Sequence, residues 1–145
     1  MDRITPEARS ANMKAVRRKD TAPEMIVRRL LYVTGYRYRL HIKKLPGSPD
    51  IVFVGRKKAI FVHGCFWHGH ECRAGRRPQS RQEYWLPKIA RNQERDAAAI
   101  RQLHRMGWNT LVVWQCETNA PNRITLETKL RDFLGAASTT AKISP

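Results

Sequence analysis

Apolar residues recur at helical spacing in several stretches of the chain. Residues 20–35 begin with an N-cap and proline pattern, repeat apolar positions, and end at Gly35, where glycine often terminates a helix. Residues 80–106 begin with a Ser-Arg-Gln-Glu capping box and end before Gly107. We expect Pro87 to break or kink the first turns of this second helix.

Two further helices are predicted nearer the ends of the chain. Residues 125–134 carry four inward positions at helical spacing, Leu126, Leu130, Phe133 and Leu134. Residues 5–17 begin with Thr-Pro-Glu, a common helix start, but they are polar and basic. The N-terminal helix is therefore expected to lie against something other than the core.

Four stretches have the pattern of strands. Residues 36–43 alternate between apolar and basic positions, which predicts a half-buried strand with a basic outer face. The apolar runs 50–54 and 59–63 are joined by four residues and predict a central hairpin, which would bring Asp50 level with His63. Residues 108–114 predict another buried strand. Strands that alternate with helices indicate an α/β domain with a mixed sheet flanked by helices.

The length and composition favour one domain that binds nucleic acid. The chain has 145 residues, and we expect residues 1–134 to form the domain and residues 135–145 to form a frayed tail. Lys and Arg number 28 against 12 Asp and Glu, a formal charge of +16, while a hydrophobic fraction of 41% excludes a disordered basic tail. Basic clusters within residues 17–19, 28–29, 43–44, 56–58 and 73–81 favour phosphate contacts over a merely soluble surface.

The sequence contains no apolar run long enough to cross a bilayer and no apolar signal core. We therefore expect a cytoplasmic protein with no membrane partner, in which thiols stay reduced.

A segment rich in cysteine and histidine, residues 62–72, predicts a metal site. Cys65, His70 and Cys72 offer three ligands within eight residues, and Cys116 follows 43 intervening residues further on. This Cys₃His set is typical of structural zinc and leaves no cysteine over, which favours it over free thiols beside surface histidines. The spacing alone leaves His68 open as an alternative to His70.

A carboxylate stands at the start of the first apolar run of the hairpin. Asp50 follows a Pro-rich turn, and alone it is most simply a turn residue. In the company of His63 and His68, however, it fits a phosphodiesterase centre. The carboxylate would hold Mg²⁺, and a histidine would take a proton from water.

Several aromatic residues stand in polar surroundings. Phe66 and Trp67 lie inside the Cys/His segment, and Tyr84 and Trp85 follow the predicted capping box. Core packing is the ordinary role of such residues, but large apolar groups beside basic ones also wedge between base steps and unstack them. Met13 on the basic N-terminal helix is placed to assist from another side.

Residues 61–72 resemble the signature of the very-short-patch-repair (Vsr) mismatch endonucleases of bacteria. Further blocks follow that family in order, at residues 10–13, 20–24, 46–50, 84–89 and 107–116, so the resemblance covers about residues 3–134. It implies a restriction-endonuclease-like fold of the PD-(D/E)xK type. It also implies a Mg²⁺-dependent nick, 5′ to the thymine of a T:G mismatch in a cytosine-methylation site, by a monomer bound to double-stranded DNA.

The resemblance also assigns roles to residues. It implies a metal site at Asp50 and the backbone carbonyl of Val62, a general base at His68, a second active-site histidine at His63, and a supporting acid at Glu24. It matches the zinc ligands to Cys65, His70, Cys72 and Cys116, which selects His70 over His68. It matches Met13, Phe66 and Trp67 to residues that intercalate beside the mismatch, and Trp85 to an aromatic group near that site.

The sequence departs from the family pattern at a few positions. Gln115 stands where some members have Glu, Ser48 stands where some have Arg, and the Glu-x-Lys of many nucleases is absent after Ala59. Two alternatives remain open at this point. One is a nicking nuclease of the same fold with a different lesion or sequence context, and the other is a non-enzymatic, zinc-stabilised DNA-binding protein.

Overall fold

The computed structural model describes residues 20–73, 75–77 and 79–136. The predicted helix over residues 5–17, together with Met13 and most of the predicted tail, lies outside the described residues. The described elements are three helices, four strands and two 3₁₀ turns: α2 (Ala22–Val33), β1 (Arg39–Leu40), β2 (Ile51–Phe53), β3 (Lys58–His63), α3 (Gln82–Arg105), β4 (Asn109–Trp114), η1 (Gln115–Thr118), η2 (Ala120–Asn122) and α4 (Arg123–Leu134).

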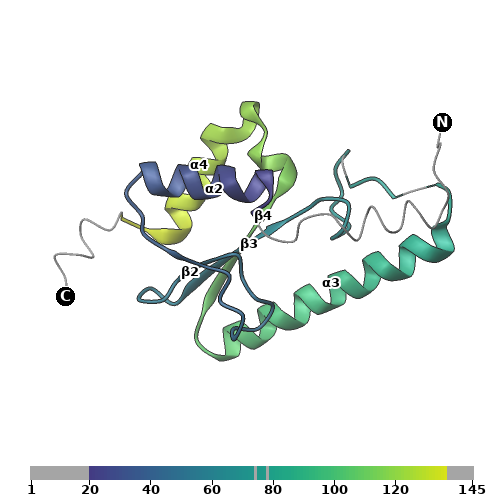
Figure 1. The fold of residues 1–145 in the computed structure, drawn as a ribbon, viewed down its shortest axis with the longest axis horizontal. Coiled ribbons are helices and arrows are strands. Elements are labelled where there is room, and N and C mark those ends of the chain that lie inside the picture. The colour runs from purple at the N-terminus through teal and green to yellow at the C-terminus, as the bar shows by residue number, and fades with distance from the viewer. Residues whose placement is uncertain (1–19, 74, 78, 137–145) are drawn as a thin grey trace.

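The four strands form one mixed sheet in the order β1-β2-β3-β4. The pairs β1–β2 and β2–β3 are antiparallel, and β3–β4 is parallel because α3 carries the chain back between them (Figure 1). In the parallel pair His63 lies opposite Trp114, so both strands end at the same level. The predicted α/β class and mixed sheet are confirmed.

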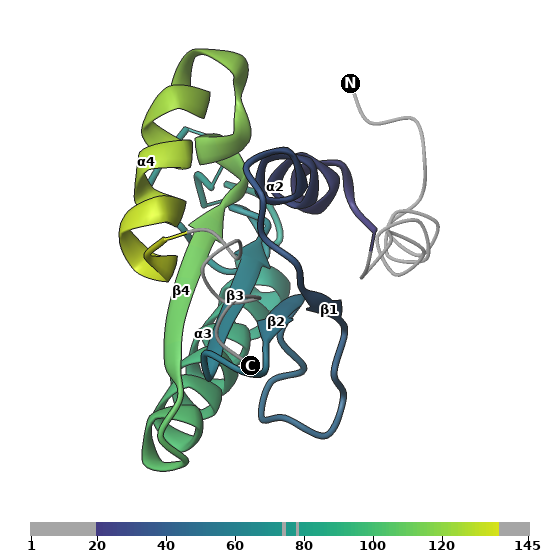
Figure 2. The same cartoon turned by 90° about the vertical axis from the view of Figure 1, so that its left-hand side faces the viewer.

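Helices cover both faces of the sheet. Figures 1 and 2 show α3 along one face and α2 with α4 on the other. On the two-helix face, Leu31 of α2 and Leu130 of α4 belong to one buried cluster with Ile60 of β3. On the α3 face, Leu103 packs with Phe61 in a second cluster. The amphipathic patterns of the sequence therefore bury their apolar faces as expected.

The predicted strand over residues 36–43 is much shorter in the structure. Only Arg39 and Leu40 form β1, because His41 has a φ of +50° and turns the chain away. Tyr36 and Tyr38 instead pack their rings edge-on against Phe53, at centroid distances of 6.3 Å each. The expectation of a buried final strand is also wrong in part, since only Val113 of β4 is fully buried.

The hairpin register differs from the prediction by two residues. Ile51 pairs with Ile60, so the tight turn falls one residue earlier than expected. The N–H of Asp50 donates to the carbonyl of Ile60 over 3.1 Å, so Asp50 is not level with His63. The reason lies in the turn, where Lys57 takes a φ of +54° and pairing resumes already at Lys58.

The start of α3 also differs from the prediction. The Ser-Arg-Gln-Glu capping box does not form, because Arg81 occupies the N-cap in a left-handed conformation without a side-chain capping bond. The helix runs unbroken through Pro87, its sixth residue. At this position a proline removes its own N–H from the hydrogen-bond ladder and its ring crowds the carbonyl of Glu83, but the remaining residues continue the helix. The predicted end before Gly107 is confirmed.

Candidate active site

The start of β2 and the end of β3 bring two of the predicted catalytic residues, Asp50 and His63, to one end of the sheet. Because β2 runs antiparallel to β3, Asp50 at the start of β2 lies beside the end of β3. The backbone N–H of Val62 donates to Asp50 Oδ2 over 2.7 Å. Burial raises the pKa of Asp50 to about 6, against the lowering effect of this bond, and the charge of Glu24 raises it further. The carboxylate therefore stands in a place that favours a neighbouring cation.

Two histidines stack face to face near this carboxylate. The rings of His63, at the end of β3, and His68, in the following loop, have centroids 3.9 Å apart and planes within 3°. Burial, and then the charge of His68, lowers the pKa of His63 to about 4. Within the described part of the chain, His63 Nδ1 is buried without a hydrogen-bond partner. His63 is thus neutral near pH 7.

The sequence analysis missed a third member of this group, Asp96 of α3. Its Oδ2 atom lies 2.5 Å from His68 Nδ1, and its Oδ1 atom lies 3.9 Å from His63 Nε2. A signal was available, since Asp96 stands three residues before the buried Ala99 and seven after the buried Ile89. A carboxylate on the apolar stripe of a helix requires a partner in the interior, and here that partner is His68.

An acidic group from α2 borders the same edge. Glu24 is 1% exposed and contacts the guanidinium of Arg28. The Nε2 atom of His41 lies 2.9 Å from Glu24 Oε2. The sequence analysis placed Arg28 only in a basic cluster, although its partner Glu24 lies four residues earlier on the same helix. His41 was not singled out, because it meets Glu24 only when the end of β1 packs beside α2.

The four predicted zinc ligands converge on one point. One ligand atom from each of Cys65, His70, Cys72 and Cys116 lies within 4.8 Å of the others, and Cys116 Sγ is 3.6 Å from His70 Nδ1. The parallel pairing of β3 with β4 explains this convergence. His63 and Trp114 are paired at the ends of the two strands, and Cys65 and Cys116 each come two residues after one of them. Sulfur and imidazole donors at separations of about 3.8 Å suit a tetrahedral metal such as zinc.

The thiol chemistry of this cluster also fits a metal. Burial raises the pKa of Cys65 to about 12. Burial acts in the same direction on Cys72, but hydrogen bonds with His70 and Cys65 outweigh it and lower its pKa to about 7. A bound cation would stabilise the thiolate forms of the set. The geometry also resolves the alternative that spacing left open, because His70 lies among the thiols whereas His68 faces Asp96.

The aromatic residues of the loop are supported from α3. Phe66, Trp67 and Trp85 contact one another edge-on, with centroid distances of 5.3 to 5.9 Å. Trp85 is buried, whereas Phe66 and Trp67 are half-buried. The side-chain amide of Asn92 donates to the carbonyl of Trp67 over 2.9 Å. The loop aromatics are therefore neither core residues nor free side chains, but a partly exposed pair held on a buried indole.

Comparisons with known proteins identify relatives of this chain. A family model described as DNA mismatch endonuclease Vsr matches residues 1–74. A type II nicking enzyme of Xanthomonas oryzae pv. oryzae, V.XorIIP, is 53% identical over 133 residues, which cover 92% of this chain and 96% of the relative. The DNA mismatch endonuclease Vsr of Escherichia coli is 38% identical over 138 residues, which cover 93% and 88%.

This chain belongs to the Vsr family. It is accordingly an endodeoxyribonuclease of DNA mismatch repair, with DNA as its substrate. The alternative of a non-enzymatic DNA-binding protein is excluded by this membership.

The departures of this Vsr-family enzyme from the family pattern have local explanations. The Oε1 atom of Gln115 accepts a hydrogen bond from the backbone N–H of Cys65 over 3.2 Å, so Gln115 supports the Cys/His loop directly. Ser48 is exposed and has a φ of +48° in the turn before Asp50, where the shape of the backbone rather than a charge is the evident requirement.

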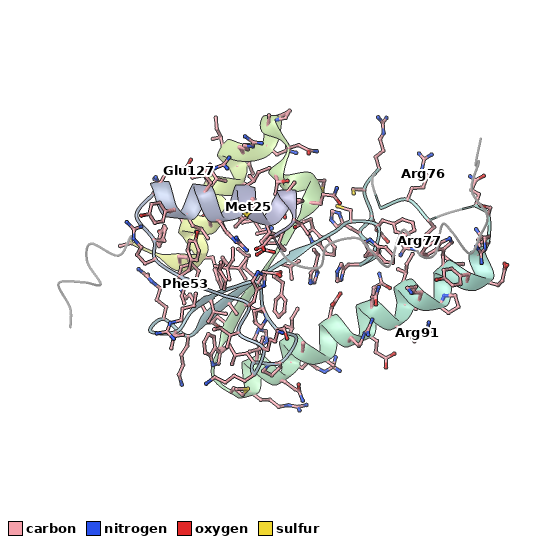
Figure 3. All side chains as sticks on the ribbon, in the orientation of Figure 1. Met25, Phe53, Arg76, Arg77, Arg91 and Glu127 are labelled. Atoms are coloured by element: carbon pink, nitrogen blue, oxygen red, sulfur yellow. The ribbon has the colours of Figure 1, made fainter. Side chains whose placement is uncertain are left out.

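Basic side chains gather at the end of the enzyme that carries the loop. Figure 3 shows Arg76 and Arg77, from the segment after the loop, and Arg91, from α3, at the end opposite Phe53 and Glu127. Arginines suit the bidentate contacts that hold phosphates. None of the described helices has the length and apolar character needed to cross a lipid bilayer.

Proposed function

We propose that this Vsr-family endonuclease nicks one strand of double-stranded DNA, 5′ to the thymine of a T:G mismatch within a cytosine-methylation site. The nick would initiate very-short-patch repair in the cytoplasm of a bacterial cell. The observation that carries the proposal is the stacked pair His63 and His68, with Asp96 on one side and the Asp50 carboxylate nearby. Carboxylate and imidazole groups so arranged suit the hydrolysis of a phosphodiester.

Asp50 and the backbone carbonyl of Val62 would hold Mg²⁺. The residues fit this ion, because the carboxylate is held by the Val62 N–H, its pKa is raised by burial, and Glu24 adds a second negative charge. When bound, the ion would polarise the scissile phosphate and stabilise the charge that develops on it.

His68 would act as the general base. Asp96 accepts the Nδ1 proton, which leaves Nε2 of His68 as the proton acceptor. A water molecule would transfer a proton to this Nε2 atom as its oxygen bonds to phosphorus, and the bond from phosphorus to the leaving sugar oxygen would break. His63 stays neutral and holds the plane of His68 by stacking.

Cys65, His70, Cys72 and Cys116 would bind a structural zinc ion. His68 lies between two of these ligands in the sequence, so the same ion would hold the loop that carries the proposed base. The residues fit, since three sulfurs and one imidazole nitrogen lie within one coordination shell.

Phe66 and Trp67, with Met13 from the N-terminal segment, would intercalate at the mismatch, and Trp85 would support them. Two partly exposed rings that pack on the buried indole of Trp85 suit a wedge. A mispaired base step also costs less to unstack than a paired one. The enzyme would bind DNA as a monomer with a restriction-endonuclease-like fold, in which histidines replace part of the missing Glu-x-Lys chemistry.

The test compares end-labelled duplexes that differ only in one base pair, T:G against T:A, within a methylation site. We expect a single nick 5′ to the thymine in the T:G duplex with Mg²⁺, and none with Asp50→Asn or without added divalent ion. Equal cutting of both duplexes would contradict mismatch specificity. A panel of other mispairs and flanking sequences would reveal the alternative, a nuclease of this fold with another target.

A further inference from the structure

One face of α3 holds two successive residues of the Cys/His loop. Asp96 Oδ2 lies 2.5 Å from Nδ1 of His68, and Nε2 of Gln93 donates to the carbonyl of Gly69 over 3.4 Å. Asp96 follows Gln93 by three residues, so both side chains project from the same side of the helix. The distance at which this part of the loop lies from α3 therefore also sets the place of His68 against Asp96.

Gly69 stands in the sequence between the proposed general base and the proposed zinc ligand His70. It is buried, and its φ of +65° lies in the left-handed region that residues with a side chain rarely adopt. Its N–H donates to the carbonyl of Phe66 over 3.3 Å, which closes the turn that contains His68. This glycine is therefore the point at which the loop turns from the base towards the metal ligands.

The structure leaves no space for a side chain at Gly69. A Cβ atom added there would lie 2.4 Å from Nε2 of Gln93, 2.8 Å from Cγ2 of Ile89 and 3.0 Å from Nη2 of Arg77. The first and the last of these atoms end long side chains that can move aside, whereas Ile89 is 2% exposed and packed in the interior. The loop lies this close to α3 only because residue 69 has no side chain.

This close approach bears on the reaction as well as on folding. A side chain at position 69 would push the loop away from α3, and the adjacent His68 would move away from Asp96 with it. A displacement of about 1 Å at a reacting group can slow a reaction by about a hundredfold. The proposed zinc ligands Cys65 and Cys116 are placed by the ends of β3 and β4 instead. The expected loss is therefore one of rate rather than of bound zinc.

We propose that Gly69 is a positioning residue for the general base: its missing side chain lets the loop pack directly on Ile89, and this contact sets the distance between His68 and Asp96. The inference rests on the proposed role of His68 as the base. Gly69 would act only through His68. A glycine that merely allows a turn would be insensitive to the side chains of α3 that face it, whereas a glycine in this role depends on them.

The experiment measures single-turnover nicking of the T:G duplex by the full-length, zinc-loaded protein in two backgrounds. One is the wild type. The other carries Ile89→Leu and Gln93→Ala, which remove the two atoms nearest to the added Cβ, while leucine keeps the volume of isoleucine. We expect Gly69→Ala to slow nicking by about 10- to 100-fold in the wild type and by less than about threefold in the second background. Zinc content and affinity for the duplex should stay within about twofold.

Gly107→Ala is the matched control. Gly107 has a φ of +87°, and no atom of the described chain lies within 4 Å of a Cβ added there. This variant carries the same kind of backbone strain without the contact, so it should nick at the wild-type rate even where its thermal stability falls. Gly69→Asn replaces Gly69→Ala in the comparison should the latter fold poorly, as judged by thermal unfolding, because asparagine tolerates the left-handed backbone.

Proton NMR follows the imidazole of His68 independently of activity. Its Nδ1 proton, bonded to a carboxylate, should give a low-field resonance that is absent from His68→Ala. The resonance should shift in Gly69→Ala and return in the second background. An unchanged resonance in Gly69→Ala, or equal slowing in both backgrounds, would overturn the inference. Failure of the proposed function gives a different result: the resonance shifts and returns as expected, while every variant nicks at the wild-type rate.

Discussion

The indole of Trp114 lies flat against the imidazole of His70, with ring centroids 4.1 Å apart and planes 12° from parallel. Its edge meets the ring of His63 at 5.3 Å. One side chain at the end of β4 thus contacts both the cysteine–histidine cluster and the proposed catalytic centre. The two sites are packed together through it.

Trp114→Leu should damage both sites together. Loss of the stack on His70 and the edge contact with His63 should lower the free energy of unfolding by about 1–3 kcal/mol. Nicking should slow by about tenfold, because the His63–His68 stack loses its support. Trp114→Phe should recover most of both losses. Unchanged bound metal and unchanged nicking in Trp114→Leu would contradict the coupling.

Asp96→Asn should slow nicking without weakening DNA binding. The amide can still contact His68 Nδ1 but no longer favours the tautomer with a free Nε2 acceptor, so we expect a loss of about 10²–10⁴ in the single-turnover rate. His68→Ala should lose a similar factor, and the double variant little more. Glu94→Gln, an exposed position on the same helix, is the control. Additive losses would show that the two residues act independently.

Asp50 and His63 should make opposite contributions to the pH dependence of stability. The pKa of Asp50 is raised from 3.8 to about 6, so its contribution to the free energy of unfolding falls as pH rises between these two values. The pKa of His63 is lowered from 6.5 to about 4, so its contribution rises with pH over nearly the same range. Without added Mg²⁺ the two should largely cancel in the wild type.

Substitution separates the two contributions. Between pH 5 and 7, the free energy of unfolding should rise with pH in Asp50→Asn and fall in His63→Gln, each by about 1–3 kcal/mol relative to the wild type. Denaturant titrations at several pH values measure this, with the exposed Asp132→Asn as control. Parallel curves for all variants would refute the assigned shifts.

Cys116→Ser should lower bound zinc and thermal stability together. The ligand set would lose one thiolate, and a structural zinc site contributes directly to folding. Metal content by mass spectrometry and the midpoint of thermal unfolding provide the readouts. Glu71→Gln, exposed between two of the proposed ligands, should change neither. One zinc per chain retained at unchanged stability would count against the site.

Gly47→Ala should destabilise the turn that precedes Asp50. Gly47 has a φ of +75°, and a Cβ atom there would lie 2.6 Å from the Cβ of Ala99 and 3.1 Å from the ring of Phe61. We expect a loss of about 2–4 kcal/mol in the free energy of unfolding. Gly55→Ala is the matched control, because no atom lies within 4 Å of its added Cβ. Similar losses in both would indicate a general effect of glycine replacement.

The sequence predicts the helices and the proposed zinc ligands better than it predicts how the strands pair. The start of α2 and the end of α3 follow from local capping and glycine signals, which act within a few residues. The proposed zinc ligands could be identified because sulfur donors are few and distinctive. The hairpin register could not, since it depends on which residue of the turn accepts a positive φ, here Lys57.

The missed residues differ in how far the sequence could have indicated them. Asp96 lies at helical spacing from the buried Ile89 and Ala99, which was a local signal, although its partner His68 comes from another element. Arg28 lies four residues after Glu24 on the same helix, which is the spacing of a helical ion pair. His41 required the tertiary structure, because it meets Glu24 only when the end of β1 packs beside α2.

The pairing of His63 with Trp114 also sets how the enzyme can vary without losing its chemistry. Adjacent parallel strands lie about 4.8 Å apart. The distance between His63 of the proposed catalytic centre and Trp114, which packs on the cysteine–histidine cluster, is therefore set by the sheet and not by the loop between β3 and α3. Added or deleted residues in the turn after Arg105 would leave that spacing intact. A single residue added within β4 would turn its side chains to the opposite faces and separate the proposed nuclease from the cluster that braces it.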